Sequence, residues 1–382
     1  MTAPYLYQRD NRYFAQTGED VKTLARQELQ QLGADDIKVT YRGLFFTALP
    51  AIMYAINYNT RLINRILAPL IVFDCRDEKI LYKTAYDIPW EDFLTSADTF
   101  AVYGSVGNST IRHSQFAALK VKDAIADRFR RKTGQRPSVD TRSADVRIHL
   151  YIMNNKATLS IDTSGGSLHR RGYRKAVVEA PMQETVAAAM IAFSGWNKAT
   201  PLIDPFCGSG TILCEAYMAA TRMPAATLRR RFGFMRLPDF HDATWQKVKK
   251  KYDAGLRPIK AGLISGSDLS HMAVRASAVN LEALAAKQFV TVKPQDFFRH
   301  DALKGKTIIC NPPYGLRMAK DFDKVSFYRN VGDFLKQKCS GSTAFIYFGD
   351  RSLIKQVGLR PNRKIPLENG GLDGRLVKYE LY

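Results

Sequence analysis

The chain has 382 residues, of which 46% are hydrophobic and 11% aromatic, so it can bury a large core and is not a disordered sequence. Its 57 lysines and arginines outnumber 36 acidic residues, and the resulting charge of +21 favours a polyanion such as nucleic acid as partner. The longest mostly apolar stretch, 44–56, is too short to cross a membrane, and the N-terminus has no basic patch followed by an apolar run typical of a secretory signal.

The first 163 residues predict an α+β region. Short strand patterns (RYFAQT, DIKVTY, TFAVYGSV, VRIHLYIMNN and KATLSID) alternate with helical patterns (EDVKTLARQELQQLG and SQFAALKVKDAIADRFRRKTG). Positive charge is concentrated at the end of this region, because residues 108–175 hold 15 lysines and arginines against 5 acidic residues. A second run, residues 222–236, holds five arginines and no acidic residue. A solvated surface explains a single basic run, but two such runs in a very basic chain favour binding to nucleic acid.

The stretch TSGGSLHRRGYRK, residues 163–175, predicts a basic linker. After it, the pattern changes to a longer alternation of helices (182–193, 210–220, 271–284 and about 327–338) and strands (202–204, 263–266, 307–310 and 343–348). Such alternation is typical of an α/β fold with a parallel, doubly wound sheet. In such a sheet, ligands bind beyond the carboxyl ends of the strands.

The first of these strand ends lies in LIDPFCGSGTILCEA, residues 202–216. Gly208 and Gly210 permit a tight turn and a close backbone approach, and the Asp204 carboxylate can accept hydrogen bonds from a cationic ligand group. No Lys-Ser/Thr pair follows the glycines, so the stretch is not a Walker loop. A dinucleotide fingerprint would require glycine at Leu213.

Three further strand ends carry polar residues. Asp268 in SGSDLSH could hold ribose hydroxyls or cap the following helix, a role that Ser270 could equally perform. In KPQDFF, Asp296 suits an adenine amino group and Phe297 suits packing against its ring. The fourth is CNPPYGLRM, residues 310–318, whose two prolines are compatible either with a simple turn or with a methyl-transfer site.

These motifs resemble those of class I methyltransferases that use S-adenosyl-L-methionine and act on exocyclic amines. Residues 204–210 resemble the Asp/Glu-x-x-x-Gly-x-Gly loop of that family, and Asn311 to Tyr314 resembles its Asn/Asp-Pro-Pro-aromatic motif. The stretches RRGYRKAVVEAPMQETVAAAM, LRRRFGFMR with HDATW, and NPPYGLRM narrow the resemblance to bacterial large-subunit ribosomal RNA guanine-N2 methyltransferases. Relatives of that family include archaeal tRNA guanine-N2 enzymes, and both kinds carry a THUMP domain.

The resemblance covers most of residues 60–382 and implies an architecture. A Rossmann-like, seven-stranded and mostly parallel methyltransferase sheet is expected, preceded by an α+β ferredoxin-like and THUMP region. The implied domains are a ferredoxin-like region (1–60), a THUMP RNA-binding domain (61–163), a basic linker (164–180) and the methyltransferase domain (181–382). The enterobacterial form is fused to a second methyltransferase, whereas this sequence stops at Tyr382, so we expect a single-activity enzyme.

The resemblance also implies the residues of the site. The Asn311 side-chain oxygen and the Pro312 carbonyl would accept the two N–H bonds of a guanine N2 amine, and Tyr314 would stack on the flipped base. Glu184 and Thr185, which with Gln183 begin a helix after Pro181, would either cap that helix or contact the methionine part of the cofactor. The full set of expected cofactor-binding residues is Asp204, Pro205, Phe206, Cys207, Gly208, Gly210, Thr211, Glu184, Thr185, Asp268, Leu269, Asp296, Phe297 and Asn311.

No metal or covalent nucleophile is expected at this site. His113, His169 and His271 share no metal-ligand spacing with cysteines or acids, and Cys207 and Cys310 have no neighbouring histidine in sequence, so both are interpreted as packing residues. The five cysteines contain no CxxC pair, which favours reduced thiols and a cytoplasmic protein.

RNA is the expected partner, with two basic clusters as its contacts: Arg170, Arg171, Tyr173 and Arg174 in the linker, and Arg229, Arg230 and Arg231. Large-subunit (23S) ribosomal RNA is the first candidate and transfer RNA the second. Two alternatives remain open, namely a DNA adenine or protein glutamine methyltransferase with the same fold, and a non-catalytic RNA-binding assembly factor. The sequence leaves the oligomeric state and the modified nucleotide undetermined.

Overall fold

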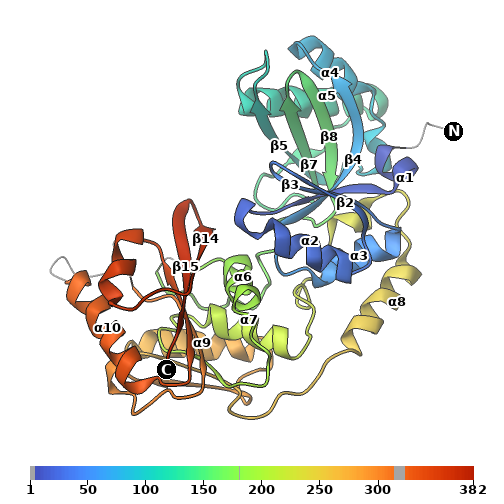
Figure 1. Cartoon of the computed structure of the whole chain (residues 1–382). Helices are drawn as coiled ribbons and strands as arrows, with labels where there is room; N and C mark the ends of the chain where they lie inside the picture. The colour runs from blue at the N-terminus through green and yellow to red at the C-terminus, as the bar shows by residue number, and fades with distance from the viewer. Residues whose placement is uncertain (1–4, 180, 314–322) are drawn as a thin grey trace. The chain divides into compact units, whose positions relative to one another are not determined.

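The computed structural model describes residues 5–179, 181–313 and 323–382 (Figure 1). The chain forms two compact units. The first comprises Met1–Leu168 with Arg229–Lys251, and the second comprises His169–Leu228 with Tyr252–Tyr382. None of the helices in the described part of the chain combines the length and apolar composition needed to cross a bilayer.

The first unit is built on an eight-stranded sheet with the order β2-β3-β1-β4-β8-β7-β5-β6. Its strands are β1 (Arg12–Gln16), β2 (Asp35–Thr40), β3 (Gly43–Thr47), β4 (Arg65–Asp74), β5 (Thr99–Gly107), β6 (Ser138–Val139), β7 (Val146–Met153) and β8 (Lys156–Asp162). Its helices are α1 (Leu6–Asp10), α2 (Lys22–Gln31), α3 (Pro50–Asn59), α4 (Glu78–Asp87), α5 (Ser114–Thr133) and α8 (Asp242–Asp253). The α+β region expected for the N-terminal part of the chain is therefore confirmed.

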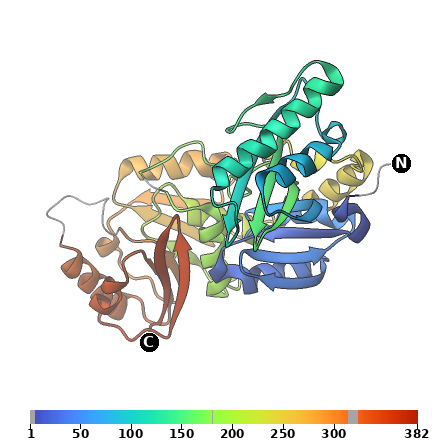
Figure 2. The ribbon, with the colours of Figure 1, turned by 90° about the horizontal axis from the view of Figure 1, so that it is seen from above.

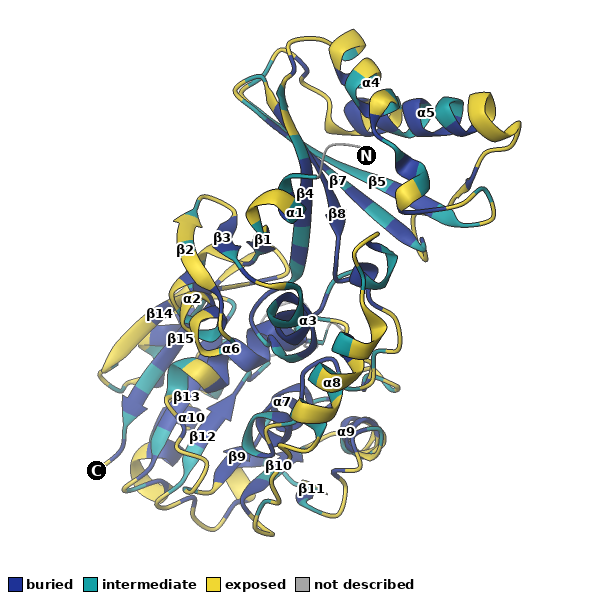
Figure 3. Cartoon of the chain, turned by 90° about the vertical axis from the view of Figure 1, so that its right-hand side faces the viewer, coloured by how far each residue is buried: buried dark blue, intermediate teal, exposed yellow. Residues whose placement is uncertain are grey.

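One face of this sheet is covered and the other is more open. In β7, VRIHLYIM, buried residues alternate strictly with half-exposed ones, because successive side chains of a strand point to opposite faces. Helices α4 and α5 pack together, and α5 lies along β5 on the covered face (Figures 2 and 3). The other face carries the half-exposed side chains of His149 and Tyr151.

The segment 229–251 belongs to the first unit, although its sequence position lies within the range 181–382 expected for the methyltransferase domain. Aromatic packing explains this difference. The ring of Phe234 lies 4.6 Å from that of Tyr54, and the ring of Trp245 lies 5.3 Å from that of Tyr58, where both tyrosines belong to α3. Burying these rings against α3 removes a large apolar area from water.

The second unit is a seven-stranded sheet with the order β11-β10-β9-β12-β13-β15-β14. Its strands are β9 (Leu202–Asp204), β10 (Ile264–Asp268), β11 (Val290–Pro294), β12 (Thr307–Cys310), β13 (Thr343–Phe348), β14 (Arg363–Asn369) and β15 (Leu372–Glu380). All neighbouring strands are parallel except β15, which is antiparallel to both β13 and β14. The expected mostly parallel, doubly wound sheet is confirmed.

The strand order of this sheet reverses between β9 and β12, so its topological switch point lies at the carboxyl ends of these two strands. The central strands are buried (Figure 3). Helix α7 packs against both α6 and α9. The helices of this unit are α6 (Glu184–Ser194), α7 (Thr211–Ala220), α9 (His271–Glu282) and α10 (Lys324–Lys338).

Candidate active site

The glycine loop at the end of β9 requires glycine for two different reasons. Gly208 and Gly210 have φ angles of 53° and 79°, in the left-handed region that side chains disfavour. A Cβ atom added at Gly210 would also lie 2.8 Å from Ser277 Oγ. The hydroxyl of Ser277 donates a hydrogen bond to the Gly208 carbonyl at 2.8 Å, so α9 holds the loop against the sheet.

Asp204, the last residue of β9, is a buried carboxylate with 1% exposure. Its Oδ1 accepts a hydrogen bond from the amide of Phe206 at 3.1 Å. Burial raises the pKa of Asp204 well above its ordinary value, and the nearby charge of Asp268 raises it further. A carboxylate buried in this way destabilises the fold, and perturbed groups of this kind are concentrated at functional sites.

Asp268, the last residue of β10, joins two loops. Its Oδ2 accepts a hydrogen bond from the Gly208 amide at 2.9 Å, and its Oδ1 accepts one from the Ser270 amide, also at 2.9 Å. The N-cap of α9 is Ser270, whose hydroxyl accepts a hydrogen bond from the Ala273 amide. Of the two residues weighed as the helix cap, the structure therefore uses Ser270 and leaves Asp268 to fix the glycine loop. Leu269, between them, is 74% exposed.

Asp296 and Phe297, which follow β11, also have clear local roles. Asp296 caps a short 3₁₀ helix by accepting a hydrogen bond from the Phe298 amide at 3.0 Å. Phe297 is 4% exposed, and its ring lies 4.9 Å from that of Phe206 and 4.4 Å from that of Phe334. The half-buried ring of Phe206 thus packs on an aromatic cluster that includes Phe297 and Phe334.

Asn311 directly follows β12, on the other side of the switch point from Asp204. Its side-chain oxygen Oδ1 is buried and has no hydrogen-bond partner among the residues that the structure describes. A buried acceptor without a partner is costly and rare, so this oxygen suits a donor supplied by a ligand. Pro312 is buried, and the Pro313 carbonyl accepts a hydrogen bond from the Tyr328 hydroxyl at 3.4 Å. Tyr314 lies outside the described residues.

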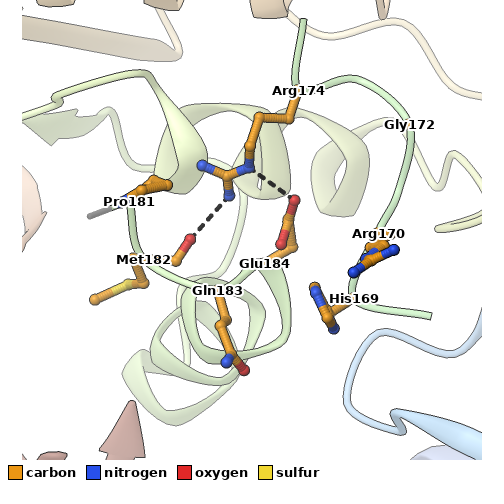
Figure 4. Close-up of a pocket in the computed structure, with 8 residues that line it drawn as sticks. All are labelled: His169, Arg170, Gly172, Arg174, Pro181, Met182, Gln183 and Glu184. Carbon is orange, nitrogen blue, oxygen red and sulfur yellow. Dashed lines mark hydrogen bonds and ion pairs between the residues drawn. The ribbon is translucent and has the colours of Figure 1, made fainter. Parts of the chain in front are cut away.

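The start of α6 borders a cavity of about 380 Å³, whose lining is labelled in Figure 4. Arg174 donates from Nε to Glu184 Oε1 at 3.0 Å and from Nη2 to the Met182 carbonyl at 2.8 Å. Glu184 is 4% exposed, so this ion pair is largely shielded from water. Gln183 is the N-cap residue of α6, and Glu184 and Thr185 are its first two residues. Arg174 therefore orders the segment before α6, and its expected RNA contact stays a prediction.

Arg171 and Tyr173 differ more strongly from the RNA-contacting role expected for them. They are 2% and 1% exposed, and both bind Glu215 of α7, Arg171 through Nε at 3.3 Å and Tyr173 through its hydroxyl at 3.1 Å. Buried side chains cannot reach a phosphate in this conformation. This burial argues against the expected RNA contact of these two residues, whereas Arg170 is exposed.

In the second basic cluster too, one arginine binds groups of the protein itself while the others are exposed. Arg229 donates hydrogen bonds to the carbonyls of Ser164, at 2.6 Å, and Ser167, at 2.7 Å, so its guanidinium organises the backbone of its own unit. Arg230 and Arg231 are exposed. Of the seven residues expected to contact RNA, the structure therefore leaves Arg170, Arg230 and Arg231 most accessible to solvent.

Sequence reasoning missed Asn280 of α9, which joins the linker to the glycine loop. Its Oδ1 accepts hydrogen bonds from the amides of Lys175, at 2.8 Å, and Ala176, at 3.0 Å. Its Nδ2 donates to the carbonyls of Ser209, at 2.9 Å, and Ala176, at 2.8 Å. The available sequence signal was the placing of Ser277 and Asn280 one turn apart on the alanine-rich face of this helix.

The described residues contain no group of three or more His, Cys, Asp or Glu side chains that could hold a metal ion. All five cysteines are buried. Burial raises the pKa of the Cys207 and Cys310 thiols well above the ordinary range, and the charge of Asp204 adds to both shifts. A buried, protonated thiol is a poor nucleophile.

Three parts of the chain match known domain families. Residues 12–67 match the RlmL ferredoxin-like domain, residues 75–162 match the THUMP domain, and residues 171–378, more than half of the chain, match the RMKL-like methyltransferase domain. The chain belongs to the RMKL-like methyltransferase family. This membership confirms the expected family and the class I methyltransferase fold.

Members with known names and structures extend the match over nearly the whole chain. The RMKL-like chain is 36% identical to a putative RNA methyltransferase, slr0064, from Synechocystis, over 97% of both sequences. It is also 36% identical to the ribosomal RNA large subunit methyltransferase K/L of Photobacterium profundum, over 97% of this chain and 53% of that protein. The chain thus spans about half the length of the K/L relatives. The solved structure of SMU.472, a putative methyltransferase complexed with SAH, matches with a TM-score of 0.84 at 25% identity, over 97% of this chain and 98% of that one.

Proposed function

We propose that this RMKL-like protein transfers a methyl group from S-adenosylmethionine to the exocyclic N2 amine of a guanine in RNA. The observation that carries the proposal is the buried Oδ1 of Asn311 at the switch point of a methyltransferase sheet, which has no hydrogen-bond partner among the described residues. An amide oxygen in that position can accept a hydrogen bond from an amine and cannot accept its proton. It therefore suits orientation of an amine nucleophile rather than its deprotonation.

The residues around the glycine loop fit S-adenosylmethionine. When bound, this cofactor supplies an electrophilic methyl group on a sulfonium. The carboxylates of Asp204 and Asp268 end neighbouring strands and can accept hydrogen bonds from an ammonium group and from ribose hydroxyls. The glycine loop between them allows a close approach of the backbone. The name of the SMU.472 structure, which includes SAH, the demethylated form of the cofactor, supports the same assignment.

In the proposed reaction, Asn311 and the Pro312 carbonyl accept one N–H each from the guanine amine and aim its lone pair at the methyl group. Alignment matters because the lone pair is delocalised into the ring, and holding two reactants in line can supply much of the rate enhancement. Formation of the new N–C bond would break the methyl–sulfur bond of the cofactor and leave SAH. The amine would lose one proton to water, because neither acceptor is basic. We propose that Tyr314 stacks on the base, which must leave its helix or loop to reach the pocket.

RNA is proposed as the substrate because of the THUMP match, the charge of +21 and the relatives' names, which include RNA methyltransferase and ribosomal RNA large subunit methyltransferase. Large-subunit ribosomal RNA is the first candidate and transfer RNA the second. Exposed arginines of both basic clusters, Arg170, Arg230 and Arg231, are the proposed phosphate contacts. An intracellular, cytoplasmic location follows from a substrate of this kind.

The test is methyl transfer from radiolabelled S-adenosylmethionine to four purified acceptors: unmodified large-subunit ribosomal RNA, transfer RNA, duplex DNA and total protein. The proposal predicts label in ribosomal RNA, and label confined to transfer RNA would move the substrate to the second candidate. Label only in DNA or protein would overturn the RNA substrate. Binding of SAH and RNA by calorimetry, with no label in any acceptor, would favour the non-catalytic alternative.

A further inference from the structure

A second pocket lies in the first unit, whereas the cavity beside α6 belongs to the other unit. Its lining residues are far in sequence from the glycine loop and from Asn311. It has a volume of about 420 Å³ and is lined by residues of β1, β2, β3, β4, β5, β7 and β8 and of the turn between β2 and β3. Pockets that hold a small ligand usually measure about 300 to 1,000 Å³. The floor of this pocket is the more open face of the sheet, opposite the face that α5 covers.

Aromatic side chains form the floor of this pocket. The rings of Tyr103 in β5 and His149 in β7 are paired in the strand register and stack with centroids 5.3 Å apart and planes 28° apart. The Tyr103 hydroxyl donates a hydrogen bond to the Thr141 carbonyl at 2.9 Å, which fixes the ring position. Burial lowers the pKa of His149 to about 4, so its imidazole is neutral at physiological pH. Tyr151 follows on the same face of β7, two residues further along.

Arginines border these rings. The guanidinium of Arg42 lies 5.7 Å from the centroid of the Tyr151 ring and donates a hydrogen bond to Ser105 Oγ. Arg42 is exposed, as is the ring of neighbouring Tyr41, at 77%. Arg65 lies 6.0 Å from the Tyr103 ring and pairs with Asp162 at 2.7 Å, so its charge is largely balanced. Asp162 is not among the lining residues, and these described residues include no aspartate or glutamate.

This combination favours one occupant. Aromatic rings and guanidinium planes are the surfaces on which unpaired nucleobases stack, and recognition of single-stranded RNA relies on them. A positive charge at the pocket with no acid in its lining suits the adjoining phosphate. A paired base cannot enter a pocket, because its faces are already stacked within a helix.

We infer that this pocket binds one unpaired nucleobase of the RNA substrate, stacked on the Tyr103, His149 and Tyr151 side of the pocket, with Arg42 holding its phosphate. The inference rests on the proposed RNA substrate and adds a second binding site to it. The pocket would recognise a single-stranded segment that is distinct from the nucleotide undergoing methylation.

The test uses the full-length protein and a short single-stranded oligoribonucleotide carrying one 2-aminopurine, whose fluorescence is quenched when it stacks. Tyr151→Ala is expected to abolish most of the quenching and to weaken binding by roughly 5- to 150-fold, the effect of losing one base–aromatic stack. Tyr151→Phe is expected to keep both. The matched control is Tyr86→Ala, because Tyr86 is a half-buried tyrosine on α4, away from this pocket.

A second pair of variants tests the phosphate contact. Arg42→Gln is expected to weaken binding of the oligoribonucleotide and to reduce the salt dependence of that binding. Arg136→Gln also removes an exposed arginine, but one outside the pocket, and is the control for the loss of one positive charge. Apart from that general effect of charge, it is expected to leave the binding and its salt dependence unchanged. A blunt-ended RNA duplex should bind all these variants alike. SAH affinity should also be unchanged in them, since the cofactor site is in the other unit.

The outcomes separate this inference from the proposed function. If the wild-type protein methylates RNA and the Tyr151→Ala and Tyr86→Ala variants quench 2-aminopurine equally, the pocket inference is wrong while the function stands. Displacement of the oligoribonucleotide from the pocket by free GMP or AMP at equal base concentration would assign the pocket to a free nucleotide and would also overturn the inference. Failure of the wild-type protein to bind any RNA would instead contradict the proposed function.

Discussion

Asp268 at the end of β10 accepts a hydrogen bond from the backbone amide of Gly208 at 2.9 Å, so the second strand end fixes the glycine loop of the first. The same carboxylate also accepts the amide of Ser270 at the start of α9. Two strand ends and a helix start are thereby held together at the switch point of the sheet. This carboxylate therefore contributes to the geometry of the proposed cofactor site, together with Ser277 and Asn280 of α9, which bind carbonyls of the same loop.

Asp268→Ala is expected to reduce SAH affinity by at least tenfold and to destabilise the protein by about 1 to 3 kcal/mol, because two amides lose their acceptor. Isothermal titration calorimetry and thermal unfolding measure the two effects. Asp301→Ala is the matched control, because it removes an exposed acid after β11. Equal SAH affinity in the two variants would show that Asp268 does not organise the loop.

Gly210→Ala is expected to lower both the melting temperature and SAH affinity. An alanine there adopts a left-handed conformation at a cost of about 1 to 2 kcal/mol, and its Cβ meets Ser277 Oγ at 2.8 Å. Gly195→Ala is a matched control, since Gly195 has a similar φ of 63° but nothing lies within 4 Å of its added Cβ. The difference between the two melting temperatures isolates the steric contact. No difference would contradict the close packing of the loop on α9.

Asp204→Asn is expected to stabilise the ligand-free protein and to weaken SAH binding. Burial raises the folded-state pKa of Asp204, so the stability contributed by this group is present at low pH and is lost as pH rises towards the folded-state pKa. The variant has no ionisable carboxyl at this position, so it does not lose stability in this way as pH rises. Its melting temperature should therefore exceed that of the wild type by a margin that grows as pH rises above about 4, the ordinary pKa of an aspartate. A wild-type protein that is more stable than the variant across this range would refute the burial argument.

Arg171 and Arg170 are adjacent in sequence, yet their substitutions should act on different properties. Arg171→Met leaves the buried Glu215 without its charge partner and is expected to destabilise the protein by about 3 to 5 kcal/mol. Arg170→Gln is expected to leave stability unchanged and to reduce the salt dependence of RNA binding by a slope of about 1. Chemical unfolding and salt titrations distinguish the two. A stable Arg171→Met protein with weakened RNA binding would instead support the RNA contact that the sequence predicted for Arg171.

The polar strand ends could be predicted from sequence because each lies at the carboxyl end of a strand that the sequence pattern predicts. Asp204, Asp268 and Asn311 therefore fall at one edge of a parallel sheet whatever the details of its packing. The family and its cofactor were expected because these motifs resemble those of class I methyltransferases. The local pattern does not contain the hydrogen-bonding state of each side chain, such as the Asn311 oxygen that has no partner among the described residues.

Features that depend on distant residues could not be predicted. RRGYRK is equally basic in solvent or in a core, and the burial of Arg171 and Tyr173 depends on Glu215, more than 40 residues later. The placing of 229–251 in the first unit depends on the tyrosines of α3, nearly 200 residues earlier. In both cases, tertiary packing decides what the local sequence leaves open.

The most direct test of the central claim is nucleoside mass spectrometry of RNA treated with wild-type protein or with Asn311→Ala in the presence of S-adenosylmethionine. The account predicts N2-methylguanine in the wild-type reaction and its loss by at least a hundredfold in the variant, with SAH and RNA affinities largely retained, because Asn311 aligns the amine without providing most of the binding energy. Full N2-methylguanine formation by Asn311→Ala, or methylation at a ring atom instead of an exocyclic amine, would contradict it.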